Sequence, residues 1–209
     1  MTRTDRPKRG TGRKTISIIV DGDTEVWYFQ MLRETENLGQ LAVKPELPAR
    51  KTLAYQFSMV CSNAQKYDQV IWLVDADTII KEIRESSKAS KIQEVKGYLG
   101  EAGKMDNVHI LFNTPCLEFW FLLHDRYTGR FYAECGAVEA QLTRSTILPE
   151  YAKTEKYFKN PKRNIYQRLK PNLKTAVSNA MRLGGFDIDE YESAKAETFK
   201  VFKILGIDV

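Results

Sequence analysis

The chain has 209 residues, of which 43% are hydrophobic and 11% aromatic, and it carries a formal net charge of +5. This apolar content is enough for a packed interior, so the composition excludes a wholly disordered chain. Every apolar stretch falls well short of the roughly 20 residues that cross a bilayer as a helix, so we expect no membrane contact.

The cysteines give an expectation about redox state. Cys61, Cys116 and Cys135 are odd in number, widely spaced and outside any Cys-x-x-Cys pattern. This argues against a disulfide framework and against a zinc site. Because such usage is typical of a reducing compartment, we expect a cytoplasmic location.

Positive charge is concentrated in two segments. Residues 1–14 have a net charge of +5 and residues 153–174 of +7, which leaves −7 for the rest of the chain. Two basic segments beside an acidic core favour contact with a polyanion such as nucleic acid. Basic tails and helix faces also serve solubility alone, so charge leaves both interpretations open.

The predicted elements alternate between strands and helices in the first part of the chain. Residues 1–13 lack periodicity, and we expect a disordered basic arm there. Short apolar runs predict strands at 15–20, 41–47, 70–74 and 108–112, the second weakened by Pro45. Helices are expected at 25–36, capped by Thr24, at 52–64, and at 79–100 with a break near 86–87.

This alternation predicts an α/β fold with a mainly parallel central sheet of about four strands flanked by helices. We assign this core to residues 14–125. In residues 126–209 helices are expected at 133–142, 164–183 and 193–205, without a core strand. The C-terminal region is therefore expected to be helical and to pack on the core.

Two acidic clusters each follow a predicted strand. Asp21, Asp23 and Glu25 come after the first strand, and Asp75 and Asp77 come after the third. The ends of parallel strands form the usual ligand crevice, so we expect these carboxylates to gather there. They would repel one another unless they held a divalent cation, and oxygen ligands suit Mg²⁺ or Mn²⁺. The sequence therefore predicts a divalent-metal site.

Each cluster also has a simpler interpretation. Glu25 stands at the start of a predicted helix, where the helix dipole alone favours a carboxylate. An Asp-x-Asp pair occurs by chance in loops, although in extended geometry Asp75 and Asp77 would point the same way and share an ion. Gly22 permits a tight turn and close approach of a phosphate, which favours the functional interpretation.

Glu118 interrupts a segment, 116–124, that is otherwise apolar except at its ends. A helix that is apolar all round is buried, so this carboxyl must be paired, hydrogen-bonded or protonated. It is either a further member of the acidic site or the partner of a nearby Lys or Arg. His124 lies about 120° round the helix from Glu118, and we expect a surface or supporting histidine rather than a general base.

Aromatic side chains alternate with lysines in the second basic segment. This suits stacking on bases together with contact to phosphates, and it also describes an amphipathic helix that covers the sheet. We expect Lys153 and Lys156 to contact phosphates. Arg13 and Lys14, from the first basic segment, are expected to help steer the same nucleic acid.

Three motifs resemble the RloB-like family. They are Asp21-Gly22-x-Thr24-Glu25 followed by Tyr28-Phe29, then Val74-Asp75-x-Asp77, and then the most distinctive, Asn113-x-Pro115-Cys116-x-Glu118-x-Trp120-x-Leu122-Leu123. The resemblance spans most of residues 15–205, with the motifs in the family's order. The family often has an Asn-Pro-Ser/Thr element before its last helix, whereas this chain reads Ser193-Ala194-Lys195-Ala196-Glu197-Thr198.

The resemblance implies a relation to the Toprim fold, the metal-binding catalytic domain of topoisomerases, primases and certain nucleases. Glu25 would then be the acid/base carboxylate, and Asp75 and Asp77 the metal ligands. The family is associated with bacterial restriction and abortive-infection loci, often beside an ATPase partner. It therefore implies a nuclease that acts on DNA or RNA in anti-phage defence.

The leading hypothesis is a Mg²⁺- or Mn²⁺-dependent phosphodiesterase in which Glu25 activates water or protonates the leaving oxygen. Glu25 would also contribute to the metal site, with Asp21, Asp23 and Glu118 in support. The alternative is a non-catalytic metal-binding or partner module of an ATPase-containing defence complex. A transferase that uses Asp-x-Asp has less support, because the chain has no glycine-rich phosphate loop.

Overall fold

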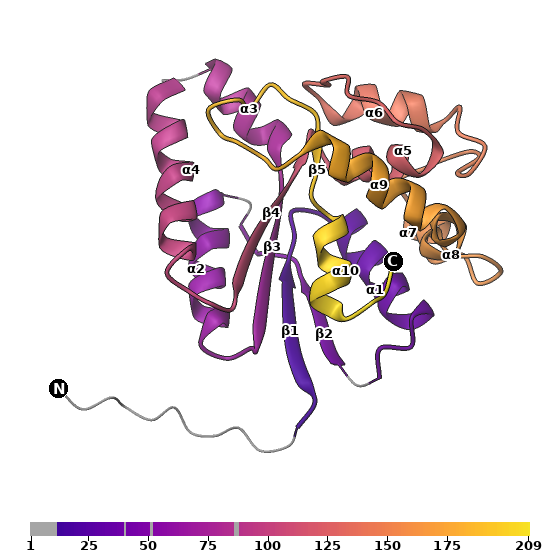
Figure 1. Cartoon of the computed structure of the whole chain (residues 1–209), viewed down its shortest axis with the longest axis horizontal. Coiled ribbons are helices and arrows are strands. Elements are labelled where there is room, and N and C mark those ends of the chain that lie inside the picture. The colour runs from indigo at the N-terminus through magenta and orange to yellow at the C-terminus, as the bar shows by residue number, and fades with distance from the viewer. Residues whose placement is uncertain (1–11, 40, 51, 86–87) are drawn as a thin grey trace.

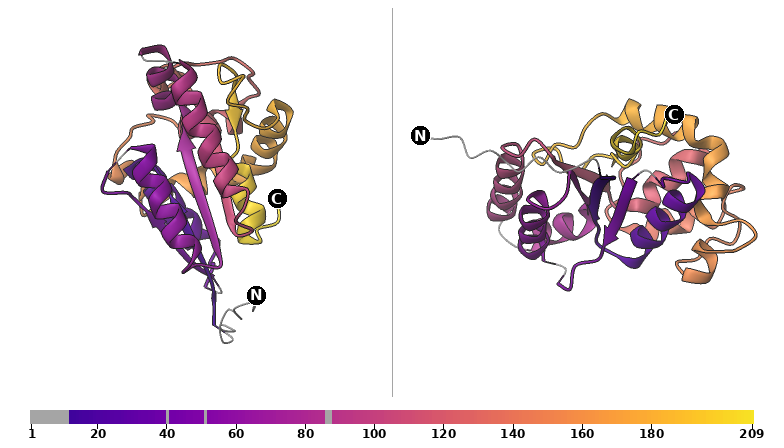
Figure 2. Two further views of the ribbon diagram at one scale, coloured as in Figure 1. Left: turned by 90° about the vertical axis from the view of Figure 1, so that its left-hand side faces the viewer. Right: turned by 90° about the horizontal axis from the view of Figure 1, so that it is seen from below.

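The computed structural model describes residues 12–39, 41–50, 52–85 and 88–209. Nearly all of the basic arm predicted at 1–13, and the helix break predicted at 86–87, lie outside these residues. Within the described part, helices cover both faces of a central sheet, which gives three layers (Figure 2). In that part, each helix is either too short or too polar to cross a bilayer.

The sheet has the strand order β2-β1-β3-β4-β5. Its strands are β1 (Lys14–Ile19), β2 (Leu41–Glu46), β3 (Gln69–Asp75), β4 (Val108–Thr114) and β5 (Lys195–Ala196). The first four are parallel and are the four predicted strands, whereas β5 pairs antiparallel with the end of β4. The helix expected at 193–205 is therefore wrong over Lys195–Ala196, and the helix there covers only Phe199–Leu205. A strand of two residues leaves no periodic pattern to detect.

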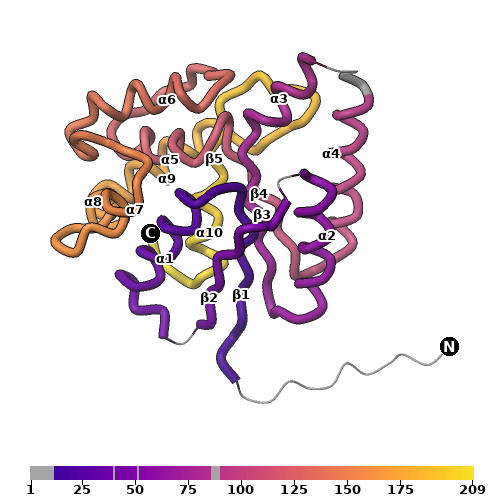
Figure 3. The backbone as a smooth tube through the Cα atoms, turned by 180° about the vertical axis from the view of Figure 1, so that it is seen from behind, coloured from indigo at the N-terminus to yellow at the C-terminus, as the bar shows by residue number. Residues whose placement is uncertain are grey.

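The helices are α1 (Asp23–Thr35), α2 (Leu53–Ala64), α3 (Ala76–Glu85), α4 (Lys88–Ala102), α5 (Leu117–Asp125), α6 (Cys135–Leu142), α7 (Glu155–Phe158), α8 (Ile165–Leu169), α9 (Leu173–Leu183) and α10 (Phe199–Leu205), with a 3-10 turn at Lys170–Asn172. Helices α2, α3 and α4 cover one face of the sheet. Helix α1 and the helices from α5 to α10 lie on the other side (Figures 1 and 3).

Alternating side chains of the strands supply two separate cores, as the period of two requires. On the face of α2 to α4, Trp72 and Val74 pack among buried aliphatic residues. On the opposite face, Ile71 and Leu73 pack with α1 and α5. Pro45 is tolerated in β2 because β2 is an edge strand, where one side needs no ladder hydrogen bonds.

The start of α1 differs from the prediction. Gly22 occupies the N-cap position, so Thr24 lies inside the first turn instead of capping the helix. Thr52 does cap α2, because its hydroxyl accepts a hydrogen bond of 3.4 Å from the amide of Tyr55. The loop after β1 therefore turns into α1 immediately, which places the first acidic cluster at the very end of the strand.

Cys116 and Cys135 form a disulfide bond, which corrects the argument from cysteine spacing against disulfides. Cys116 is the N-cap of α5 and Cys135 is the first residue of α6. The chain folds back between these helices, so their N-terminal ends meet, with a distance of 5.7 Å between the Cα atoms of the two cysteines. A separation of 19 residues in sequence carries no signal of this return. Cys61 is a free thiol.

Candidate metal and phosphate site

The carboxyl ends of β1 and β3 lie side by side at the centre of the sheet. The chain leaves β1 into α1 on one face and leaves β3 into α3 on the other (Figure 1). Such a point, where the direction of winding reverses, is where open α/β sheets bind ligands. Asp21, Glu25 and Asp75 all come from these two strand ends. We call this region the acidic edge, defined by Asp21, Glu25, Asp75, Asp77 and Glu118.

Glu25 lies in the first turn of α1 with only 2% of its surface exposed. Its Oε2 accepts a hydrogen bond of 3.1 Å from the Thr24 hydroxyl. A Cβ at position 22 would lie 2.9 Å from the same oxygen, so a side chain there would make the Glu25 carboxylate shift. Burial raises the pKa of Glu25 to about 7, and the charges of Glu118 and Asp21 act in the same direction.

Asp75 ends β3 and contains the least satisfied oxygen of the edge. Its Oδ1 is buried and has no hydrogen-bond partner among the described residues. Burial, followed by the charges of Glu25, Glu118 and Asp77, raises the pKa of Asp75 well above its usual range. A buried acceptor without a donor is unfavourable, and a cation beside it would remove the penalty.

Asp77 lies in the first turn of α3, so the predicted extended alternation with Asp75 is wrong. The chain becomes helical directly after Asp75, and the amide of Asp77 donates to the carbonyl of Pro115 at 3.0 Å. Its Oδ1 accepts a hydrogen bond of 2.7 Å from the amide of Thr78. Burial raises the pKa of Asp77, and the charge of Asp21 adds to this. The two aspartates still interact, because the charge of Asp77 also raises the pKa of Asp75.

Glu118 is fully buried in α5, and of its two predicted alternatives the pairing with a lysine is observed. Its Oε1 lies 3.0 Å from Nζ of Lys153 and accepts a hydrogen bond of 2.8 Å from the Tyr151 hydroxyl. Its charge also raises the pKa values of Glu25 and Asp75. The segment after α6 is thereby connected to the acidic edge through a single carboxylate.

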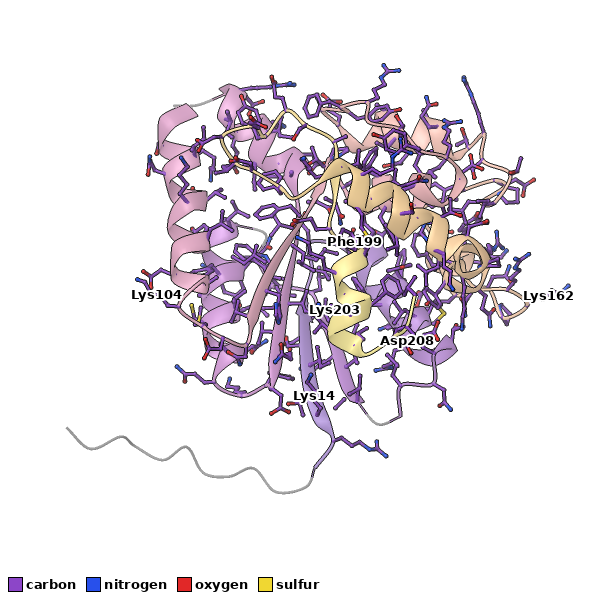
Figure 4. The ribbon with its side chains drawn as sticks, viewed as in Figure 1. Lys14, Lys104, Lys162, Phe199, Lys203 and Asp208 are labelled. Carbon is purple, nitrogen blue, oxygen red and sulfur yellow. A yellow bond between two sulfur atoms is a disulfide. The ribbon has the colours of Figure 1, made fainter. Side chains whose placement is uncertain are left out.

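The four cations predicted to contact nucleic acid separate in space. Lys153 lies at the acidic edge, where it also pairs with Glu139 at 2.9 Å. Lys156 is exposed on α7. Arg13 and Lys14 lie at the other end of β1, as Figure 4 shows for Lys14. A nucleic-acid strand bound at the acidic edge would therefore meet Arg13 and Lys14 at a different part of its length from the part that meets Lys153.

The remaining predicted acids differ in their surroundings. Asp21 is half-buried, and its Oδ1 accepts a hydrogen bond of 3.0 Å from Gln56 of α2. Gln56 in turn accepts a hydrogen bond of 2.7 Å from the Trp72 indole, so Asp21 is held by a buried chain of contacts. Asp23 is exposed in the first turn of α1.

A pocket of about 430 Å³ opens beside Asp77. It is lined by Asp77, Thr78, Ile80, Lys81, Arg84, Glu85, Ala133 and Glu134. Lys81 and Arg84 follow Asp77 by four and seven residues, which places all three on one face of α3. That spacing is visible in the sequence, and it could have predicted two cations close to Asp77, in a pocket that Glu85 and Glu134 also line.

The stretch 193–198, where the chain departs from the family's usual element, braces the end of β4. The Thr198 hydroxyl donates to Oδ1 of Asn113 at 3.0 Å, and both residues are fully buried. The Glu197 carboxylate accepts a hydrogen bond of 2.9 Å from the amide of Phe112. Sequence reasoning missed this role, because the contacts join residues 85 apart.

His124 is buried, with 2% exposure, so of the two expected alternatives, a surface or a supporting histidine, the first is wrong. Its Nδ1 lies 3.0 Å from the carbonyl oxygen of Trp120. Burial lowers the pKa of His124 to about 4. Helix α5 is enclosed on all sides, so even its last turn is shielded from solvent.

These features define an α/β protein with buried carboxylates at the switch point of a parallel sheet. The model of one protein family, described as RloB-like protein, matches residues 16–202. The chain therefore belongs to the RloB-like family. No curated protein and no solved structure gives a significant match to it.

Proposed function

We propose that this protein is a divalent-metal-dependent nuclease that hydrolyses phosphodiester bonds of DNA or RNA. The observation that carries the proposal is the unpartnered, buried Oδ1 of Asp75 beside other carboxylates. Oxygen donors of this kind suit Mg²⁺ or Mn²⁺. The raised pKa values at Glu25, Asp75 and Asp77 fit the same interpretation, since like charges without a cation disfavour ionisation.

In this mechanism Asp75, Asp77 and Glu25 would hold the ion. When bound, a divalent ion orients the phosphate and stabilises negative charge that develops on its oxygens. Glu25 would accept a proton from water or donate one to the leaving oxygen. Lys153 offsets the charge of Glu118, so that this buried carboxylate supports the edge without a second ion.

The pocket beside Asp77 supplies a place for the substrate backbone. Lys81 and Arg84 line it beside Glu85 and Glu134, and these two cations are the groups there that could pair with a phosphate flanking the bond to be cut. Arg84 pairs with Glu192 at 2.8 Å on the surface, and this exposed contact is weak enough to exchange for a phosphate. We propose nucleic acid as the partner on this basis.

Wider features of the proposal rest on the family. The order β2-β1-β3-β4, with Glu25 after β1 and the aspartates after β3, supports a relation to the Toprim fold. We propose a role in bacterial anti-phage defence with an ATPase partner, as the family resemblance implies, and a location in the cytoplasm.

A non-catalytic module is the second candidate. The 2% exposure of Glu25 favours it, because a general base must reach the atom whose proton it takes. Under this hypothesis the carboxylates hold an ion that only stabilises the fold or the surface for a partner protein.

The deciding experiment combines metal binding with cleavage. Calorimetry with Mn²⁺ should show binding to the wild type and to Asp208→Asn, an exposed control far from the edge (Figure 4), and loss in Asp75→Asn/Asp77→Asn. Glu25→Gln should stay folded and cleave DNA, RNA or tRNA about 10²-fold more slowly or worse. Full cleavage by Glu25→Gln removes its catalytic role. If the wild type binds metal but cleaves neither DNA, RNA nor tRNA, the result favours the non-catalytic module.

A further inference from the structure

The Cys116–Cys135 disulfide lies next to the acidic edge and is unequally accessible at its two ends. Cys116 is buried, with 1% exposure, whereas Cys135 is half-buried at the start of α6. A small thiol from solvent therefore has better access to Cys135 than to the buried Cys116. This directs thiol exchange to one sulfur, as exchange depends on access to the attacked atom.

The surroundings of Cys135 accommodate the reduced state as well as the bridge. Its Sγ lies 3.0 Å from Oε2 of Glu118 and 3.4 Å from Nζ of Lys153. A disulfide sulfur carries no proton and cannot donate to Glu118, whereas a thiol at the same place can. Reduction thus gains a hydrogen bond that the bridge cannot make. Stabilising the reduced form makes a disulfide easier to reduce.

The same bridge fixes groups that belong to the acidic edge. Ala133 and Glu134, directly before Cys135, form the wall of the pocket beside Asp77. Lys153, in contact with Cys135, pairs with Glu118. Reduction of the disulfide would therefore release one wall of the pocket beside Asp77. It would also change the contacts of Glu118.

We propose that Cys116 and Cys135 form a reversible thiol–disulfide site that controls the acidic edge, with the bridged form being the one that binds metal and substrate tightly. The expected change in metal affinity rests on the proposed function, whereas the redox chemistry of the two cysteines does not. The co-reactant is a low-molecular-weight thiol and its disulfide, such as the glutathione pair. A covalent link holds the pocket wall in place before binding, which lowers the entropic penalty of ordering it.

The reaction balances as two exchanges. The thiolate of one small thiol attacks Sγ of Cys135, the bond between the two protein sulfurs breaks, and Cys116 leaves as a thiolate that takes up a proton. A second small thiolate then attacks the mixed disulfide at the small molecule's sulfur. Cys135 is released and protonated, so two small thiols are oxidised to one disulfide while the protein gains two thiols.

The first test measures the redox site without reference to metal. The folded chain is equilibrated with reduced or oxidised glutathione, its reactive thiols are counted by mass after alkylation, and amide exchange is followed over Cys135–Leu142. We expect one thiol, Cys61, in the oxidised sample and three in the reduced one, with faster exchange in α6 after reduction. Three thiols under both conditions, or unchanged exchange, overturns the proposal.

The second test measures Mn²⁺ affinity in both redox states. Reduction should weaken binding by about threefold or more and reoxidation should restore it. Cys116→Ser/Cys135→Ser should stay at the weak value in both conditions, and Cys61→Ser, the matched control, should switch like the wild type. Equal Mn²⁺ affinity of the oxidised and reduced wild type overturns the proposal that the disulfide controls the acidic edge. Absence of Mn²⁺ binding in every state counts against the proposed metal site. The redox site is then tested by the number of thiols and the rate of amide exchange alone.

A third measurement excludes a different use of the same side chains. Cys116, Cys135 and Glu118 offer three ligand atoms within 4.8 Å of one another, a set that thiol reduction would make available to zinc. The reduced chain is dialysed against Zn²⁺ and then exposed to oxidised glutathione. We expect the disulfide to re-form. One zinc retained per chain with both thiols protected from oxidation overturns the proposal in favour of a metal site.

Discussion

The ammonium group of Lys153 lies 3.0 Å from the carboxylate of Glu118, a residue with no exposed surface. Removing one partner of a buried pair leaves a charge that the interior cannot solvate. Because about a third of the Lys153 side chain is exposed, solvent moderates the penalty. We expect Lys153→Met to lower the free energy of unfolding by about 1 to 3 kcal/mol, measured by urea denaturation.

The neighbouring lysine provides the control for that prediction. Lys156→Met changes an exposed side chain of the same segment and should alter stability by less than about 0.5 kcal/mol. Adding Glu118→Gln to Lys153→Met should recover much of the lost stability, because the uncompensated charge is then gone. A double variant that is no more stable than Lys153→Met alone would show that the loss comes from packing and not from charge.

Glu25 should reduce the stability of the metal-free fold at alkaline pH. Its pKa is about 7 in the folded chain against an ordinary value of 4.5, so the folded state binds more protons than the unfolded state between these values. Stability therefore falls as pH rises through this window and stays low above it. At pH 8 we expect Glu25→Gln to raise the free energy of unfolding by about 1 to 3 kcal/mol, with Asp208→Asn as an unchanged control. A destabilised Glu25→Gln would assign Glu25 a structural role.

Metal affinity should depend on pH for the same reason. The raised pKa values of Glu25 and Asp75 mean that binding a divalent ion must displace protons. We expect Mn²⁺ affinity to increase between about pH 6 and pH 8, together with release of protons, which calorimetry in two buffers of different ionisation enthalpy detects. Flat affinity across this range would indicate that the ion binds away from Glu25 and Asp75.

The sequence predicted the parts of the fold that depend on local patterns. Continuous apolar runs identified β1, β3 and β4, and the acids that follow β1 and β3 meet at one edge because parallel strands end together. It did not predict the bridge between Cys116 and Cys135 or the strand at Lys195–Ala196. These depend on contacts between segments that return from elsewhere in the chain, and no periodicity records them.

The errors at single residues have one cause in common. Asp77 was placed in extended geometry and His124 near the surface, since both assignments assumed that a local pattern continues to its end. In the structure the strand stops at Asp75, and the last turn of α5 is enclosed by other elements. Contact with phosphates was predicted for Lys153 and stays a prediction, whereas its pairing with Glu118 could be seen only with the helix that carries Glu118 in place.

Thr198 should matter for stability even though it lies in the stretch that departs from the family's element. Its hydroxyl donates to Oδ1 of Asn113 at 3.0 Å, and both residues have no exposed surface. Thr198→Val keeps the shape and removes the donor, which leaves a buried acceptor unpaired. We expect a loss of about 1 to 3 kcal/mol in urea denaturation, against little change for the exposed Thr175→Val. Equal stability of the two variants would mean that Asn113 finds another donor.

His124 should make the fold sensitive to mild acid. Its pKa is about 4 in the folded chain and 6.5 when unperturbed, because burial disfavours the imidazolium. The unfolded state therefore binds more protons between pH 6.5 and 4, and stability is lost as pH falls through this window.

Glu25 acts in the opposite direction over part of this range, so the contribution of His124 has to be measured as a difference. Unfolding of the wild type and of His124→Gln is compared at pH 7.5 and pH 5, and the effect of Glu25 cancels between the two proteins. We expect the wild type to lose about 1 to 2 kcal/mol more than the variant on acidification. His109→Gln, a change at a half-buried histidine in β4, should retain most of the acid sensitivity of the wild type. If His124→Gln keeps it in full, His124 is already protonated in the fold or opens to solvent before unfolding.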